Sequence, residues 1–244
     1  MAEPALDQQT QLASLRELLR TKFPGQGVLD RPEYGFLSSG VARLDALLGG
    51  GLPAGALTLI TGGPSSGKTG MALAFCAELT RQGGSVAWVH QGALSAASVA
   101  HAGVVLDRLL AVRAGSSVQA QRCADFLLRW QAFHLVVIDH PGRGGRGAAW
   151  TRIHKLVTGS REALLVLAPS LPEGDPLRYC ASVYAEASHR PGAGGMTSEL
   201  TLLKSRYRRP GGTEVLRSCG MEGACFALLP DLPGLGQAWH DEID

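Results

Sequence analysis

Short apolar runs alternate along this chain with longer segments in which apolar residues recur at helical spacing. The apolar runs predict strands over residues 56–61, 85–90, 109–112, 134–139 and 163–168, and the helical spacing predicts helices over residues 68–82, 117–130 and 148–157. Strands that alternate with helices are typical of βαβ crossovers. The pattern therefore predicts an α/β fold whose mostly parallel sheet is covered by helices on both faces.

The two ends of the chain have a different pattern. Leucines 12, 15, 18 and 19 recur at helical spacing and predict an amphipathic helix over residues 8–22, and a second short helix is expected over 41–48, before Gly49-Gly50-Gly51. After the last core strand, residues 179–187, 198–207 and 213–219 are predicted to be strands joined by turns at 191–195 and 210–212. We expect these to add antiparallel strands at one sheet edge. We expect the chain to divide into an N-terminal helical arm and linker (1–35), a core (36–220) and an acidic C-terminal tail (221–244).

Composition adds little, but the distribution of charge is informative. Net charge is only +2, whereas residues 200–220 hold five basic residues against one acid, and residues 221–244 hold five acids and no Lys or Arg. A basic segment beside an acidic tail is common in proteins that meet nucleic acid; a solvated face and a disordered end explain it equally well. The five cysteines form no CxxC pair, which argues against zinc and a disulfide framework. The polar N-terminus and the lack of a long apolar run predict a cytoplasmic protein with no membrane partner.

A complete phosphate-binding motif lies between the strand at 56–61 and the helix at 68–82. It is G-x-x-x-x-G-K-[ST], present here as Gly62, Gly63, Pro64, Ser65, Ser66, Gly67, Lys68 and Thr69. Its glycines let backbone N–H groups turn toward phosphate oxygens, Lys68 supplies a cation to the β- and γ-phosphates, and the Thr69 hydroxyl coordinates Mg²⁺. The motif predicts binding of ATP with Mg²⁺.

Asp139 closes the apolar strand Leu135-Val136-Val137-Ile138-Asp139, about 70 residues after the P-loop. A carboxylate at the end of such a strand can hold the Mg²⁺ water shell beside Thr69. Asp139 and Thr69 are therefore the candidate magnesium residues.

Residues 38–69, SSGVARLDALLGGGLPAGALTLITGGPSSGKT, resemble the start of the RecA/RadA recombinase core. LRYCASVYAEA at 177–187 and LLKSR at 202–206 resemble two later strands of that family, so the resemblance covers about 180 residues. It implies a RecA-like three-layer core, a mostly parallel sheet with antiparallel edge strands.

The departures from that family concern catalysis and DNA. Its members carry a water-activating glutamate just after the strand at 85–90, where this chain reads His90-Gln91-Gly92. Gln91 is the candidate for orienting a water, and we expect weak ATPase activity at most. The two DNA-binding loops of the family are shortened here to residues 141–147 and 169–176, and we therefore do not expect strand exchange.

Two pairs of basic residues are further candidates. Arg143 and Arg146 lie on a Gly-rich turn within reach of DNA phosphates, although a solvated turn explains them as well. Lys204 and Arg206 match a basic pair that, in RecA filaments, reaches the nucleotide of the neighbouring subunit, which would couple self-association to nucleotide; a basic solvent edge is the alternative.

A short RecA-like chain with an N-terminal helix also resembles ImuA, an accessory family of SOS-induced translesion mutagenesis in the bacterial DNA-damage response. That resemblance implies RecA, ImuB and an error-prone polymerase as partners, with single-stranded DNA as a further one. Retention of Lys68 is unlike many ImuA members. Two alternatives stay open: a DNA-dependent ATPase or recombinase of the RecA/RadA type, and a RecA-fold regulator such as a cell-division inhibitor.

Overall fold

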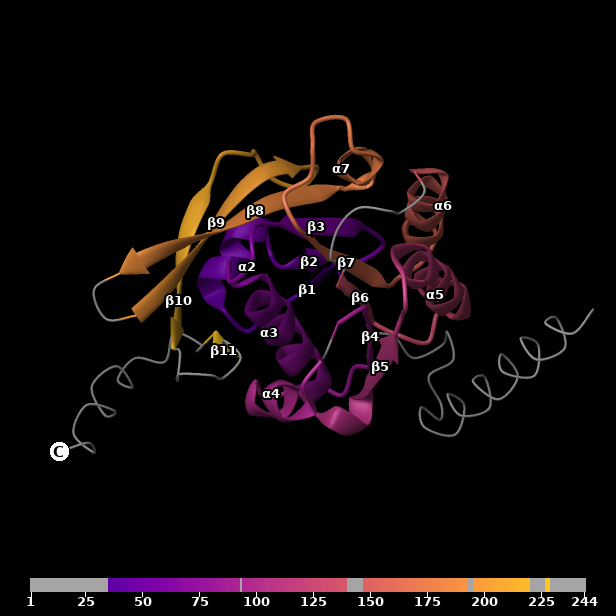
Figure 1. Ribbon diagram of the computed structural model, residues 1–244, viewed down its shortest axis with the longest axis horizontal. Coiled ribbons are helices and arrows are strands. Elements are labelled where there is room, and N and C mark those ends of the chain that lie inside the picture. Colours follow the sequence, from indigo (N-terminus) through magenta and orange to yellow (C-terminus); the bar gives the residue numbers. More distant parts are fainter. Residues whose placement is uncertain (1–34, 93, 140–146, 193–194, 220–226, 229–244) are drawn as a thin grey trace, which may run out of the picture.

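The computed structural model describes residues 35–92, 94–139, 147–192, 195–219 and 227–228. Within these residues a nine-stranded sheet has the order β11-β10-β9-β8-β3-β7-β6-β4-β5 (Figure 1). A separate two-stranded sheet pairs β1 (Phe36–Leu37) with β2 (Leu52–Pro53) in antiparallel register.

The parallel half of the large sheet consists of the strands predicted from apolar runs. β3 is paired in parallel with β7 on one side and β8 on the other, and β7, β6, β4 and β5 follow in parallel register. Every residue of β3 and β7 is buried, as expected for strands covered on both faces. Their bounds are β3 Leu57–Thr61, β4 Val86–His90, β5 Leu109–Arg113, β6 Leu135–Asp139 and β7 Ala163–Ala168.

Four later strands extend this sheet on the β3 side. β8 (Val183–Gly192) is still parallel to β3, and the antiparallel pairing begins with β9 (Gly195–Ser205) and continues through β10 (Thr213–Cys219) to β11 (Ala227–Leu228). The predicted mostly parallel sheet with antiparallel edge strands is confirmed.

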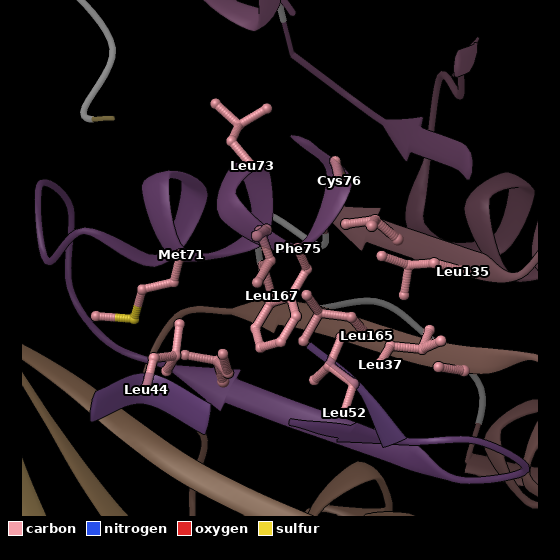
Figure 2. Close-up of a cluster of buried hydrophobic side chains, with 14 of the residues drawn as sticks. Leu37, Leu44, Leu52, Met71, Leu73, Phe75, Cys76, Leu135, Leu165 and Leu167 are labelled. Atoms are coloured by element: carbon pink, nitrogen blue, oxygen red, sulfur yellow. The ribbon is translucent and has the colours of Figure 1, made fainter. Parts of the chain in front are cut away.

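Helices cover both faces and enclose two apolar clusters. On one face α2 (Ala42–Leu48) and α3 (Lys68–Arg81) pack on the sheet; on the other lie α5 (Ser117–Trp130), α6 (Gly147–Thr158) and α7 (Pro176–Cys180). α4 (Ala96–His101) and the 3₁₀ turn η1 (Leu106–Arg108) precede β5. Figure 2 shows Phe75 of α3 directed toward Leu165 and Leu167 of β7. Burial of a side chain such as Phe75 contributes about 1.5–3 kcal/mol.

Strand alternation divides the sheet residues between these clusters. Leu165 and Leu167 join the cluster under α3, whereas Leu164 and Val166 join the cluster under α5 and α6. The same alternation decides which side chains at the strand ends lie on the α3 face.

The predicted helices and strands of the core agree with the structure within about two residues, with two exceptions. The strand expected at 179–187 is wrong at its start, because Asp175 accepts a hydrogen bond from the N–H of Leu177 and Pro176 favours a first helical turn, so residues 176–180 form α7. The strand expected at 198–207 begins earlier, at Gly195, and ends at Ser205, so Arg206 lies beyond it and the turn expected at 191–195 is shorter.

The helix predicted over 8–22 lies outside the described residues, as does the acidic tail except for Ala227–Leu228, which form β11. The division into arm, core and tail stays a prediction. Among the helices that the structure describes, none is both long and apolar enough to cross a membrane.

Candidate nucleotide site

The P-loop connects β3 directly to α3 and closes around the ammonium group of Lys68. Lys68 Nζ donates to the carbonyl oxygens of Gly62 and Gly63, each at 2.7 Å, and to Ser66 Oγ at 3.1 Å. In the described part of the chain, no backbone carbonyl accepts from the N–H groups of residues 63 and 65–67. Free N–H groups around a lysine at the N-terminus of a helix are what a bound triphosphate requires.

Glycine is required in this loop for a tertiary reason as well as a chemical one. A Cβ atom on Gly62 would overlap with the carbonyl oxygen of Ala187 on β8, and one on Gly67 would overlap with the side chain of Ser198 on β9. Around Gly63, by contrast, a Cβ would meet no atom within 4 Å. The β8–β9 pair therefore supports the loop from one side, and the loop stays open near Gly63.

Lys68 and Asp139 interact across the α3 face of the sheet, and both are taken partly out of water. Burial lowers the pKa of Lys68, which the charge of Asp139 partly opposes. Burial likewise raises the pKa of Asp139, and the nearby charges of Lys68 and His90 oppose that rise. The partner charge therefore opposes the effect of burial on the pKa of each group and does not cancel it.

The donors suit Mg²⁺ held jointly with a nucleotide, because Mg²⁺ usually takes one or two protein oxygens and keeps waters and phosphates as its other ligands. Thr69, half-buried in the first turn of α3, and Asp139 are the protein oxygens in question. The described residues contain no group of three or more His, Cys, Asp or Glu side chains that would hold a metal alone. The roles of the P-loop residues, Thr69 and Asp139 stay predictions.

His90, which the sequence reasoning passed over, lies closer to this chemistry than Gln91 does. The Gln91 side chain donates to Ser117 Oγ at 3.3 Å, and Ser117 begins α5 on the opposite face of the sheet. His90 follows Trp88 by two residues, and Trp88 belongs to the cluster under α3. Side chains along residues 85–90 alternate between the two faces of the sheet, and this alternation in the sequence is the signal that separates His90 from Gln91.

Lys204 and Arg206 lie away from the P-loop of their own chain. Lys204 Nζ donates to the carbonyls of Arg178 (3.3 Å) and Tyr179 (3.2 Å) near the end of α7. The N–H of Arg206 donates to the carbonyl of Ser182, whose own N–H donates to Leu57 at the start of β3. Because the P-loop follows the carboxyl end of β3, the backbone of this basic pair lies near the opposite end of that strand.

The basic pair nevertheless forms one charged cluster with α6. Burial is the main cause that lowers the pKa of His154, and the charges of Arg206 and Lys204 lower it further. Lys204 in turn has a lowered pKa, from burial and then from Arg206. This corner of the molecule therefore accumulates positive charge.

The two loops that correspond to DNA-binding loops differ in what the structure describes. Arg143 and Arg146 fall within residues 140–146, outside the described residues. The connection from β7 to α7, residues 169–175, contains Glu173 and Asp175 and no Lys or Arg. An acidic connection is unsuited to phosphate contact.

Comparison with known proteins finds RecA-like relatives over part of the chain. Residues 27–142 match the family model described as the RecA N-terminal domain. Over 104 residues, 42% of this chain, it is 43% identical to Protein RecA of Nostoc punctiforme and 41% identical to that of Brevibacillus brevis. These matches span only 29% and 30% of the two RecA proteins.

Two solved structures share the fold over most of their length. The RadB recombinase superposes with a TM-score of 0.64 at 22% identity, over 75% of this chain and 96% of that one. The flagellar accessory protein FlaH from Methanocaldococcus jannaschii gives a TM-score of 0.62 at 15% identity, over 80% and 99%. Identities this low establish the fold alone.

Proposed function

We propose that this chain, which is RecA-like in its fold and over residues 27–142, binds ATP with Mg²⁺ and serves as an accessory protein of the ImuA type in the bacterial DNA-damage response. The observation that carries the nucleotide part is the phosphate loop closed around Lys68, with Asp139 at the end of β6, two strands from β3, near enough for its charge to influence the pKa of Lys68. The accessory role is argued from the short connections that this chain has where recombinases have longer loops.

In this proposal each residue has a separate task. The N–H groups around Gly63 and Ser65 hold phosphate oxygens, and Lys68 exchanges its carbonyl partners for the β- and γ-phosphates. Thr69 supplies a hydroxyl to Mg²⁺, and Asp139 holds the water shell of the ion. Bound Mg²⁺ would offset the desolvation of the Asp139 carboxylate, and the bound triphosphate would offset that of the Lys68 ammonium group.

The accessory role rests on short connections. β6 and α6 are separated by residues 140–146, and β7 and α7 by residues 169–175, which are few for holding and exchanging two DNA strands. The chain also lacks the carboxylate expected after β4. We therefore propose action through RecA, ImuB and an error-prone polymerase in translesion mutagenesis, with modest DNA binding.

The nucleotide proposal is tested by titrating the full chain with a fluorescent ATP analogue and Mg²⁺. Lys68→Ala is expected to weaken binding by at least about tenfold, because a charge-assisted contact to phosphate contributes about 1.5–3 kcal/mol. Lys155→Ala, which changes an exposed lysine on α6, is the matched control and keeps the native affinity. Equal affinity for Lys68→Ala and the native chain would refute the P-loop assignment.

The accessory role is tested with purified partners. We expect the full chain to bind RecA or ImuB in surface plasmon resonance and to lack strand exchange. Absence of binding to both would overturn this part while leaving the nucleotide site intact.

A second candidate, a DNA-dependent ATPase, is favoured by one observation: the identity of 43% to a RecA protein. ATP turnover measured with and without single-stranded DNA separates the two. Strong stimulation by DNA would favour the ATPase, and unchanged turnover favours the accessory protein.

A further inference from the structure

His90 and Asp139 occupy neighbouring positions at the carboxyl ends of two paired strands. β4 and β6 run parallel with Val89 opposite Ile138, so the next pair along the two strands is His90 and Asp139. Both side chains lie on the face of α3, since Val89 and Ile138 belong to the cluster on the other face. Their proximity is also evident in the influence of His90 on the pKa of Asp139.

A hydrogen bond fixes which nitrogen of the His90 ring is free to accept. His90 Nδ1 lies 2.7 Å from the carbonyl oxygen of Gly92. A carbonyl oxygen can only accept, so Nδ1 carries the proton. In the neutral ring the lone pair is then on Nε2, the arrangement by which proteins hold an imidazole for a ligand or a water.

His90 is better placed than Gln91 to contact a water beside the γ-phosphate of a bound nucleotide. Gln91 is engaged with Ser117 on the α5 side of the sheet. His90 is half-buried on the α3 side, in the row of the sheet that contains Asp139 and beside the helix that begins with Lys68. An attacking water beside a γ-phosphate held by Lys68 would meet His90 before it met Gln91.

We propose that His90 Nε2 orients the water that attacks the γ-phosphate, in place of the missing carboxylate. This inference rests on the proposed ATP-binding function. Nε2 accepts a hydrogen bond from the water and directs its oxygen lone pair at the γ-phosphorus. The oxygen–phosphorus bond forms as the bond to the β,γ-bridging oxygen breaks, ADP leaves with that electron pair, and one water proton passes to bulk solvent. Catalysis of phosphoryl transfer depends chiefly on such positioning.

Two substitutions separate Nε2 from Nδ1. His90→Gln places an amide near the position of Nε2, and His90→Asn places one near Nδ1, where it can keep the bond to Gly92. If Nε2 holds the water, Gln retains turnover within about tenfold, whereas Asn and Ala lose about 100-fold, the lower range for removing one positioned hydrogen-bonding group from an active site. His101→Ala, an exposed histidine on α4, is the control.

Affinity provides a measurement that does not depend on turnover. Mg²⁺ with ADP and tetrafluoroaluminate mimics the in-line water and the transferred phosphoryl group. His90→Ala is expected to weaken binding of this complex by about 100-fold and to leave binding of Mg-ADP within about twofold. A merely structural role of His90 would weaken both equally.

The outcomes distinguish this inference from the proposed function. If the native chain binds neither Mg-ATP nor Mg-ADP, the proposed function fails. If it binds Mg-ATP and either shows no turnover or turns over as fast after His90→Ala, the role of His90 is refuted and the nucleotide site remains. If Gln91→Ala loses turnover and His90→Ala keeps it, the role of His90 is also refuted, and Gln91 is again the candidate for orienting the water.

Discussion

The side chain of Ser198 on β9 occupies the space that a Cβ atom on Gly67 would need. Ser198 is buried, and Gly67 is the last P-loop residue before α3, with φ 88°. The phosphate loop is therefore packed against a strand that comes some 130 residues later in the chain. Its shape depends on the β8–β9 pair as well as on its own motif.

Gly67→Ala is expected to destabilise the protein by about 2–4 kcal/mol, from the left-handed backbone and the overlap with Ser198. That corresponds to a melting temperature lower by about 4–16 °C. Gly63→Ala is the control, because a Cβ there meets nothing within 4 Å, and it should melt within about 2 °C of the native chain. Thermal unfolding without nucleotide checks both; equal melting temperatures would show that Ser198 does not constrain the loop.

Asp139→Asn is expected to raise the melting temperature while weakening Mg-nucleotide binding. Burial raises the pKa of Asp139 in the folded chain, so the folded state holds this proton more tightly than the unfolded state does. Stability is therefore lost as pH rises from the usual carboxyl range through the raised pKa, and the ionised form is unfavourable at pH 7.

The neutral amide of Asn removes the cost of burying an ionised carboxylate. Each kcal/mol of destabilisation removed raises the melting temperature by about 2–4 °C. As pH falls through about 3.9 the carboxyl becomes protonated in the unfolded state as well, so the difference between Asp139→Asn and the native chain should shrink toward zero. Differential scanning calorimetry at about pH 7 and about pH 3.5 makes the comparison. A lower melting temperature for Asp139→Asn at pH 7 would contradict the assigned cost of burial.

Lys204→Ala combined with Arg206→Ala is expected to weaken self-association that depends on nucleotide. Their backbone lies near the start of β3, at the opposite end of that strand from the P-loop of the same chain, so a nucleotide contact would be to a second copy. Sedimentation velocity with Mg-ATP measures it, with the exposed Arg209→Ala as control. Sedimentation of the double variant like that of the native chain would leave Lys204 only its bonds to the carbonyls of α7.

Arg143→Ala combined with Arg146→Ala is expected to reduce affinity for single-stranded DNA and to flatten its salt dependence. Removal of one arginine–phosphate interaction lowers the slope of log affinity against log salt by about 0.7. Fluorescence anisotropy between about 50 and 200 mM salt provides the slope. Arg161→Ala, an exposed arginine before β7, is the control. An unchanged slope would exclude the Gly-rich turn as a DNA-binding segment.

Local patterns in the sequence determined the parallel core and the phosphate loop. Apolar runs such as 163–168 become buried strands, and G-x-x-x-x-G-K-[ST] between a strand and a helix has one common geometry, because both depend on residues close together in the chain. Asp139 at the end of β6 belongs to the same class of prediction.

Only the tertiary structure decided which side chains surround that loop. The register between β4 and β6 set His90 rather than Gln91 beside Asp139, and the return of β8 and β9 placed Ala187 and Ser198 against the loop. The cap at Asp175 and Pro176 that forms α7 is a local signal, but the tertiary structure decided that Lys204 donates to the carbonyls near the end of this helix. The placement of His90 beside its neighbour Asp139 and the contacts of the loop with β8 and β9 join residues 49 or more positions apart. Pairing across such separations is settled by packing of the whole sheet rather than by the local pattern.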